Sequence, residues 1–319
     1  MFTSRKKQID QLYKQILCRE VDTNGLKHWA KSNLPIDEIH TQLLHSDEYK
    51  SVLQTKLAFN NTLIEQPRVV ERSVTVPFWD SDTEAQFQKN KETFGPSWKY
   101  YNTPITYEIN SLGYRMKEFD QIDWSNYMVV LGCSHTAGVG LNLEETWPYR
   151  ISQELNMDLV NGAIPGGTNE FMLMNLTRLL NNRTPPKLVV FNWTYVARQS
   201  YRSNGGFEIY GLAEQPTGKW EDEWKKYLAS PQDWAYDFLE LKERAILLCK
   251  LAGIPAWHIT HSDQHYYDDT IELIPYNFFP TDRNYEQARD IYDTWSHSGK
   301  ELQDRVIESW HRAKKTIIQ

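Results

Sequence analysis

The sequence predicts a three-layer α/β/α domain with a parallel sheet, preceded by a small all-α module. Short apolar runs at 128–131, 159–161, 188–191 and 254–259 end in small or polar residues, as buried parallel strands do. Segments with helical spacing of apolar residues alternate with these runs, at 146–155, 169–180, 233–252 and 299–314. Alternating strands and helices favour a parallel sheet covered by helices on both faces.

The chain divides into three parts by pattern. Residues 8–52 predict three short helices, because apolar side chains recur there at helical spacing and polar turns separate them. We therefore expect residues 1–57 to form a helical interaction module. Residues 58–104 lack periodicity and contain four prolines, which favours a linker and an extended lead-in. The α/β domain then spans 105–319.

The N-terminal segment LYKQILCREVDTNGLKHWAKSNLPIDEIHTQLLHSDEY is similar to a known family of small helical domains of unknown function. That family occurs in bacterial S-layer and haemolysin-type secreted proteins and is related in pattern to phycobilisome linker domains. Its pattern has a Leu-Tyr helix, an Arg-x-x-Asp-x-x-Gly-Leu-x-x-Trp turn from Arg19 to Trp29, and a closing Ser-x-Glu-Tyr. The resemblance implies an attachment module, with a protein assembly partner for residues 1–57.

Composition excludes several function classes. The 319 residues carry 35 Lys and Arg against 42 Asp and Glu, a net charge of -7, which argues against nucleic acid and anionic membranes as partners. No apolar run is long enough to cross a membrane, and the N-terminus lacks a secretory signal. We expect the chain to be cytoplasmic as made, with association to a virion as its route to a surface. Three cysteines, Cys18, Cys133 and Cys249, without paired spacing argue against disulfides.

Polar or small residues follow every predicted strand, and ligands of open α/β sheets bind at this edge. Cys133 and Ser134 follow the first strand, a Gly-rich loop the second, Asn192 to Thr194 the third, and His261 the fourth. His258, His261 and His265 run from strand into loop and do not share a helix face, so we expect no metal and no other cofactor. The sequence thus predicts one cleft.

The segments GCSHTAGVGLNLEETWPYRISQEL, VNGAIPGGTNE, KLVVFNWT and SHSGKEL resemble the SGNH/GDSL hydrolase family over residues 105–319. The resemblance implies a flavodoxin-like sheet and a serine esterase. Ser134 matches the family's nucleophile, whose own N–H also serves the oxyanion hole, and Gly166 matches the second oxyanion donor. His297 matches the general base, which takes the serine proton and returns it to the leaving group.

Three positions depart from the family pattern. Cys133 replaces the acid that normally precedes the nucleophile. The third motif normally supplies an Asn side chain as a hydrogen-bond donor to the oxyanion hole. The corresponding loop here runs from Asn192 to Thr194, so Thr194 or Asn192 has to supply that donor. The family also places an Asp three residues before the His, which is a Thr in this chain. Asp293 and Asp290 are therefore both candidates for the acid that orients His297.

The sequence predicts a serine esterase whose substrate is a carbohydrate ester. We expect it to remove O-acetyl groups from a cell-surface polysaccharide. The aromatic content of 13% and the surface associations of the N-terminal family point to carbohydrate. The alternative is an inactive SGNH-like protein that binds glycan, or a structural subunit of a phage or surface assembly docked by residues 1–57. The sequence favours a small buried residue at a strand end for Cys133, and the alternative is a reactive thiol near a helix N-terminus.

Overall fold

The computed structural model describes residues 5–17, 19–32, 34–49, 63, 72–196, 198–203, 206–210, 231–261, 270–274, 288–290 and 299–318. The chain forms two compact units, Met1–Thr62 and Leu63–Gln319. Two of the predicted catalytic residues, Asp293 and His297, lie outside the described residues. No described helix is long and apolar enough to cross a membrane.

The N-terminal unit contains the expected helices. These are α1 (Arg5–Leu12), a π-helical turn η1 (Tyr13–Leu17), α2 (Thr23–Lys31) and α3 (Ile36–His45). Its small core holds side chains from each of them: Ile9, Leu12, Tyr13, Ile16, Leu17, Trp29, Ile39 and Leu43.

The residues of the Arg-to-Trp pattern hold this unit together. Arg19 binds both Asp22, at 3.0 Å, and Glu48, at 2.5 Å, so it ties the turn before α2 to the closing Ser-x-Glu-Tyr segment. Asp22 in turn caps α2 by accepting hydrogen bonds from two backbone N–H groups. Trp29 donates a hydrogen bond to the Tyr13 hydroxyl at 2.9 Å. The pattern therefore specifies the fold of this unit.

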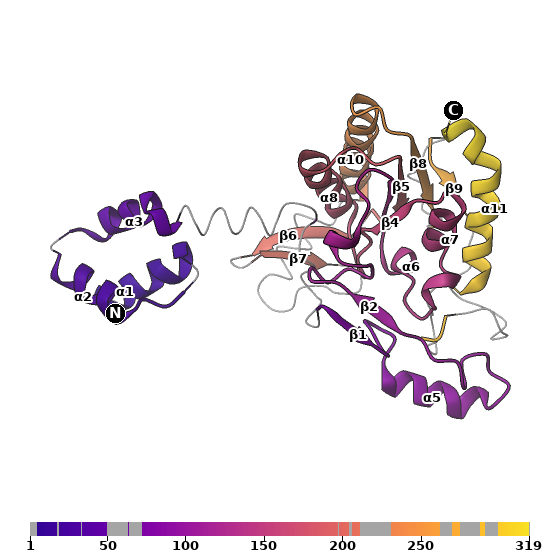
Figure 1. Cartoon of the computed structure of the whole chain (residues 1–319), viewed down its shortest axis with the longest axis horizontal. Helices are drawn as coiled ribbons and strands as arrows, with labels where there is room; N and C mark the ends of the chain where they lie inside the picture. The colour runs from indigo at the N-terminus through magenta and orange to yellow at the C-terminus, as the bar shows by residue number, and fades with distance from the viewer. Residues whose placement is uncertain are drawn as a thin grey trace. The chain divides into compact units, whose positions relative to one another are not determined.

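The second unit is built on a five-stranded parallel sheet (Figure 1). Its strands are β3 (Tyr127–Leu131), β4 (Asp158–Asn161), β5 (Leu188–Trp193), β8 (Ala256–Thr260) and β9 (Glu272–Leu273). They lie in the order β4-β3-β5-β8-β9, which is the 2-1-3-4-5 order of flavodoxin-like folds. Strand order reverses between β3 and β5, and these two strands pair in parallel with Leu131 opposite Phe191.

Helices cover both faces of the sheet, which gives the expected three layers (Figure 1). Val129 and Leu131 of β3 pack into a core with α8 (Asn169–Asn182) and α10 (Pro231–Leu251). Met128 and Val130 of the same strand pack into a second core with α7 (Trp147–Glu154) and α11 (Lys300–Ile317). Because successive side chains of a strand point to opposite faces, a strand buried on both faces is apolar throughout.

The lead-in is more structured than the sequence suggests. Residues 58–104, expected to be a linker and extended lead-in, contain β1 (Val74–Val76) and α5 (Glu84–Phe94), and β1 pairs with β2 (Tyr107–Ile109), which lies just after this stretch. This segment belongs to the α/β unit. A buried ion pair of 2.6 Å between Asp82 and Arg289 joins it to residues 288–290. The sequence missed α5 because two side chains on its buried face, Gln86 and Asn90, are polar.

The remaining elements are short. They are the antiparallel hairpin β6 (Gln199–Ser203) and β7 (Gly206–Tyr210), the helix α6 (Ser134–Ala137), and the 3-10 turns η2 (Phe119–Gln121) and η3 (Leu143–Glu145). The sequence analysis did not identify the hairpin or the two-residue strand β9, which is too short to carry a pattern.

Candidate active site

Ser134 lies at the point where the strand order reverses. It is the first residue of α6 and follows β3 by three residues. Its side chain is 5% exposed. The first N–H groups of a helix have no partner within that helix, so the Ser134 N–H is available to an oxyanion, as the resemblance implies. The turn requires glycine at 132, because a Cβ there would lie 2.1 Å from the Thr136 hydroxyl oxygen.

The Gly-rich loop after β4 lies against the end of β3. Ile164 donates its backbone N–H to the Gly132 carbonyl at 3.0 Å, and a Cβ on Gly167 would lie 3.2 Å from the same carbonyl oxygen. Gly166 has φ of +69°, in the left-handed region that favours glycine. The structure therefore brings the loop of Gly166 against the strand end that leads to Ser134.

Asn192, one of the two substitutes for the oxyanion Asn, uses both ends of its amide inside the protein. Its Nδ2 donates to the Thr136 hydroxyl at 2.8 Å, and its Oδ1 lies 3.1 Å from Nδ1 of His261. All three side chains are buried. The amide therefore joins the carboxyl ends of β5 and β8 to α6.

Thr194, the other substitute, is held from two sides. Its backbone N–H donates to Asn169 Oδ1 at 2.9 Å, and Asn169 Nδ2 donates back to the Thr194 carbonyl at 3.0 Å. Arg198 donates to the Thr194 hydroxyl oxygen at 2.8 Å. Since the guanidinium is only a donor, the hydroxyl proton of Thr194 has to point elsewhere. Arg198 thus places a cation next to the Thr194 hydroxyl oxygen.

Cys133, which replaces the family's acid, is a buried thiol next to Ser134. Burial raises its pKa, but a hydrogen bond with His261, the charges of His261 and Arg198, and the His135 N–H outweigh burial and lower the pKa to about 5. The ring of His261 also lies 4.7 Å from that of His135, between centroids. At neutral pH this environment favours the thiolate.

Asp290 is fully buried, and its Oδ2 accepts a hydrogen bond from Ser81 at 2.8 Å. Gly140 lies against it, because a Cβ there would be 2.8 Å from Asp290 Oδ1. Burial raises the pKa of neighbouring Asp82, against the lowering effect of Arg289. Asp290 thus belongs to a polar cluster that ties the lead-in to the loop after α6.

The sequence analysis assigned no catalytic role to His261 or Arg198. Both follow a predicted strand at the edge where the cleft is expected, and His261 is also one of the histidines considered there as a metal ligand. The structure gives the two neighbouring described histidines different partners: His258 accepts a hydrogen bond from Trp193 at 3.2 Å and stacks on Phe191, whereas His261 contacts Asn192. Within the described ranges, no three His, Cys, Asp or Glu side chains are placed to hold a metal ion.

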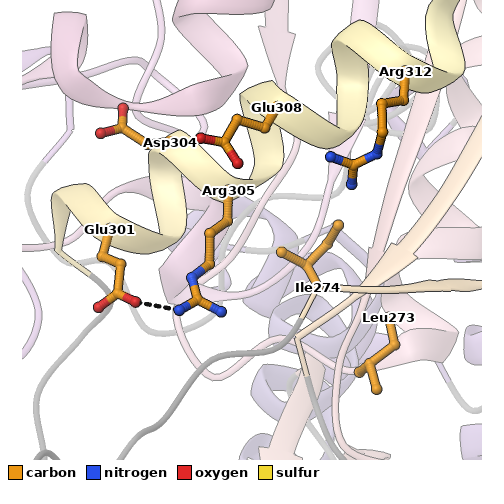
Figure 2. A pocket seen from close by; sticks show the side chains of 7 residues that line it. All are labelled: Leu273, Ile274, Glu301, Asp304, Arg305, Glu308 and Arg312. Carbon is orange, nitrogen blue, oxygen red and sulfur yellow. Dashed lines mark hydrogen bonds and ion pairs between the residues drawn. The ribbon is translucent and has the colours of Figure 1, made fainter.

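Two cavities differ in their relation to this site. One of about 470 Å³ lies between α11 and β9 and contains none of the predicted residues; the side chains around it, shown in Figure 2, are Leu273, Ile274, Glu301, Asp304, Arg305, Glu308 and Arg312. Another of about 270 Å³ includes Asn169 and Arg198, which hold Thr194. It also contains Trp234, Phe238 and Asp237 of α10. The second cavity is the one adjacent to the candidate site.

No protein-family model matches this chain, and no curated protein matches it. Among solved structures, TesA is similar at 17% identity over 60% of this chain and 99% of its own, with a TM-score of 0.38. AlinE4, described as an SGNH-hydrolase family esterase, has 13% identity over 61% and 97%, with a TM-score of 0.30. A GDSL-like lipase from Bacteroides thetaiotaomicron VPI-5482 has 17% identity over 60% and 65%, with a TM-score of 0.23. At these identities and TM-scores, the solved structures assign no chemistry to this chain.

Proposed function

We propose that this chain is a serine esterase of the SGNH type, with Ser134 as its nucleophile. One observation carries the proposal: Ser134 begins α6 at the reversal point of the sheet, where the loop of Gly166 contacts Gly132 and the end of β5 contacts Thr136 of α6. Ligands of open α/β sheets bind at this place. A serine hydroxyl there can attack an ester carbonyl once a base removes its proton.

The charge that develops on the carbonyl oxygen needs donors. The Ser134 and Gly166 N–H groups supply two, by the resemblance. We assign the third to the Thr194 hydroxyl, because the Asn192 amide is hydrogen-bonded to Thr136 and His261. Arg198, 2.8 Å from the Thr194 oxygen, adds positive charge behind this donor. His297 remains the proposed base, with Asp293 or Asp290 as its acid.

The proposed substrate is an O-acetyl ester on a cell-surface polysaccharide. The 270 Å³ cavity next to Thr194 supports it, because it combines the Trp234 and Phe238 rings with the carboxylates of Glu170 and Asp237. Aromatic rings pack on the apolar faces of sugars, and carboxylates accept hydrogen bonds from sugar hydroxyls.

Hydrolysis of p-nitrophenyl acetate by the wild type, Ser134→Ala and His297→Ala tests the esterase. We expect activity in the wild type and its loss in both variants. Ser309→Ala is a matched control, since this buried serine lies on α11 and binds Glu272 away from the site. If all four proteins match the buffer rate, and a fluorophosphonate fails to label Ser134, the proposal is wrong.

A second candidate is a glycan-binding protein without catalysis, alone or as a subunit of a phage or surface assembly docked by residues 1–57. The internal engagement of Asn192 favours it, because loss of one oxyanion donor costs about 10²–10³ in rate. This candidate predicts acetylated polysaccharide binding without turnover. The docking role is tested by deleting residues 1–57: assembly that survives the deletion contradicts it.

A further inference from the structure

We propose that Arg115 positions the nucleophile Ser134 by holding the opposite end of α6. This role rests on the proposed function, because it concerns the same serine. Arg115 lies between β2 and β3 in the sequence, and its side chain is 2% exposed. Its guanidinium donates hydrogen bonds to backbone carbonyls, and no carboxylate of the described residues forms an ion pair with it. A charge buried in this way depends on fixed dipoles to offset the loss of water.

The guanidinium binds the end of α6 and the loop that follows it. Nη1 donates to the carbonyls of Gly138 at 2.5 Å and Ala137 at 3.3 Å. Nη2 donates to those of Leu141 at 2.8 Å and Thr106 at 3.3 Å. Burial lowers the pKa of the guanidinium to about 10, which leaves it charged at neutral pH. Because the last carbonyls of a helix lack partners and carry partial negative charge, Arg115 anchors the C-terminal end of this four-residue helix.

Two hydrogen bonds in series connect Arg115 to the backbone of Ser134. Arg115 donates to the Gly138 carbonyl, and the Gly138 N–H donates to the Ser134 carbonyl at 2.9 Å. The Val139 N–H also donates to that carbonyl, at 3.2 Å. A shift of Gly138 would therefore shift the hydroxyl and the N–H of Ser134, which the proposed reaction uses as nucleophile and oxyanion donor.

The residues around the guanidinium leave room for it and hold the same loop. A Cβ on Gly138 would lie 3.1 Å from Nη1 of Arg115 and 2.3 Å from Cγ2 of Thr146, and its φ of +76° also favours glycine. The guanidinium lies 4.4 Å from the centroid of the Tyr107 ring. The Tyr107 hydroxyl accepts a hydrogen bond from the Gly140 N–H at 2.9 Å. The loop after α6 is thus bound at its carbonyls by Arg115 and at one N–H by Tyr107.

Arg115→Met and Arg115→Lys, made in the full chain and assayed with p-nitrophenyl acetate, test this role. Met removes every donor, so kcat per folded molecule should fall about 10²-fold with little change in KM, because a misplacement of about 1 Å costs that much. Lys keeps the charge but loses the planar fork that reaches carbonyls on both sides. It should therefore lose about tenfold in kcat, and it replaces Met in every measurement if Arg115→Met fails to fold.

Tyr114→Phe is the matched control for a loss of stability alone. It removes a buried hydroxyl from the neighbouring residue, and that hydroxyl accepts a hydrogen bond at 2.8 Å from Asn175 of α8, not from α6. The free energy of unfolding should fall, whereas kcat per folded molecule should stay at the wild-type value. Equal losses of kcat in Tyr114→Phe and Arg115→Met would overturn the positioning role.

Amide hydrogen exchange followed by mass spectrometry gives a second readout that needs no turnover. Peptides covering 134–141 should exchange roughly tenfold faster in Arg115→Met, since hydrogen bonds to a charged group change the local opening equilibrium by that order, and α8 should exchange as in the wild type. Unchanged exchange at 134–141, or unchanged kcat, overturns this inference and leaves the serine esterase untouched. A wild type without esterase activity contradicts the proposed function, and exchange at 134–141 then decides whether Arg115 holds α6.

Discussion

Arg198 donates a hydrogen bond to the Thr194 hydroxyl oxygen over 2.8 Å, immediately after β5. This contact turns the hydroxyl proton of Thr194 away from the guanidinium. The family that the sequence resembles places an Asn donor in this loop, and here the nearby Asn192 is engaged with Thr136 and His261. We therefore expect Thr194, bound by Arg198, to take the place of that asparagine in the proposed oxyanion hole.

Thr194→Val removes the hydroxyl with little change in volume. If Thr194 is the third donor, kcat for p-nitrophenyl acetate should fall about 10²–10³-fold, and Thr194→Ser should restore most of it. Thr177→Val on α8 is the matched control, because that hydroxyl binds only the preceding turn, at the Leu173 carbonyl. Unchanged kcat in Thr194→Val would assign the donor to another group.

Gly166→Ala tests the second oxyanion donor. An L-residue in the left-handed region costs about 1–2 kcal/mol, so the free energy of unfolding should fall by that amount. Gly253→Ala provides a comparison, since Gly253 follows α10 with a φ of +66° and a Cβ there meets no atom within 4 Å. Urea unfolding should show similar losses for both, whereas only Gly166→Ala should lose esterase activity. Equal activity in the two variants would remove Gly166 from the site.

Breaking the buried Arg289–Asp82 pair should lower the free energy of unfolding more than breaking an exposed ion pair does. Arg289→Met leaves a buried carboxylate without its cation and should lower the free energy of unfolding by about 3–5 kcal/mol. Arg305→Met on the exposed face of α11 breaks its pair with Glu301 and should cost about 0.5 kcal/mol or less. Adding Asp82→Leu to Arg289→Met should regain part of the loss. A double variant less stable than Arg289→Met would contradict this account.

The thiol of Cys133 should make stability depend on pH. Its pKa falls from an ordinary value of 9.0 to about 5 on folding, so the unfolded chain binds the proton more tightly. The stabilising contribution is complete above about pH 9, shrinks as the pH falls, and is lost near pH 5. Urea unfolding of the wild type and Cys133→Ser across this range should show a difference that grows with pH. A constant difference would mean that the thiol does not ionise there.

Much of the fold was predictable because its determinants are local. β3 and the first four residues of β5 are apolar, and such a run indicates a buried strand whichever strands it pairs with, so the sequence analysis located both strands to within two residues. α5 was not predicted, because it lacks such an apolar pattern. Its buried face carries Gln86 and Asn90, which hydrogen-bond to each other, and Asn90 also reaches the Arg289 carbonyl. A helix whose buried face is polar gives no hydrophobic period.

The sequence by itself determined the alternation of the main strands and helices in the α/β unit, the glycine turn before Ser134, and the set of polar residues at the strand ends. Only the tertiary structure shows that Asn192 is bound by Thr136 and His261 while Thr194 is bound by Arg198, and only it joins Asp82 to Arg289. The physical reason is distance along the chain. Propensity and periodicity act over neighbouring residues, whereas hydrogen bonds between strand ends depend on sheet register and connection path, which no local pattern encodes.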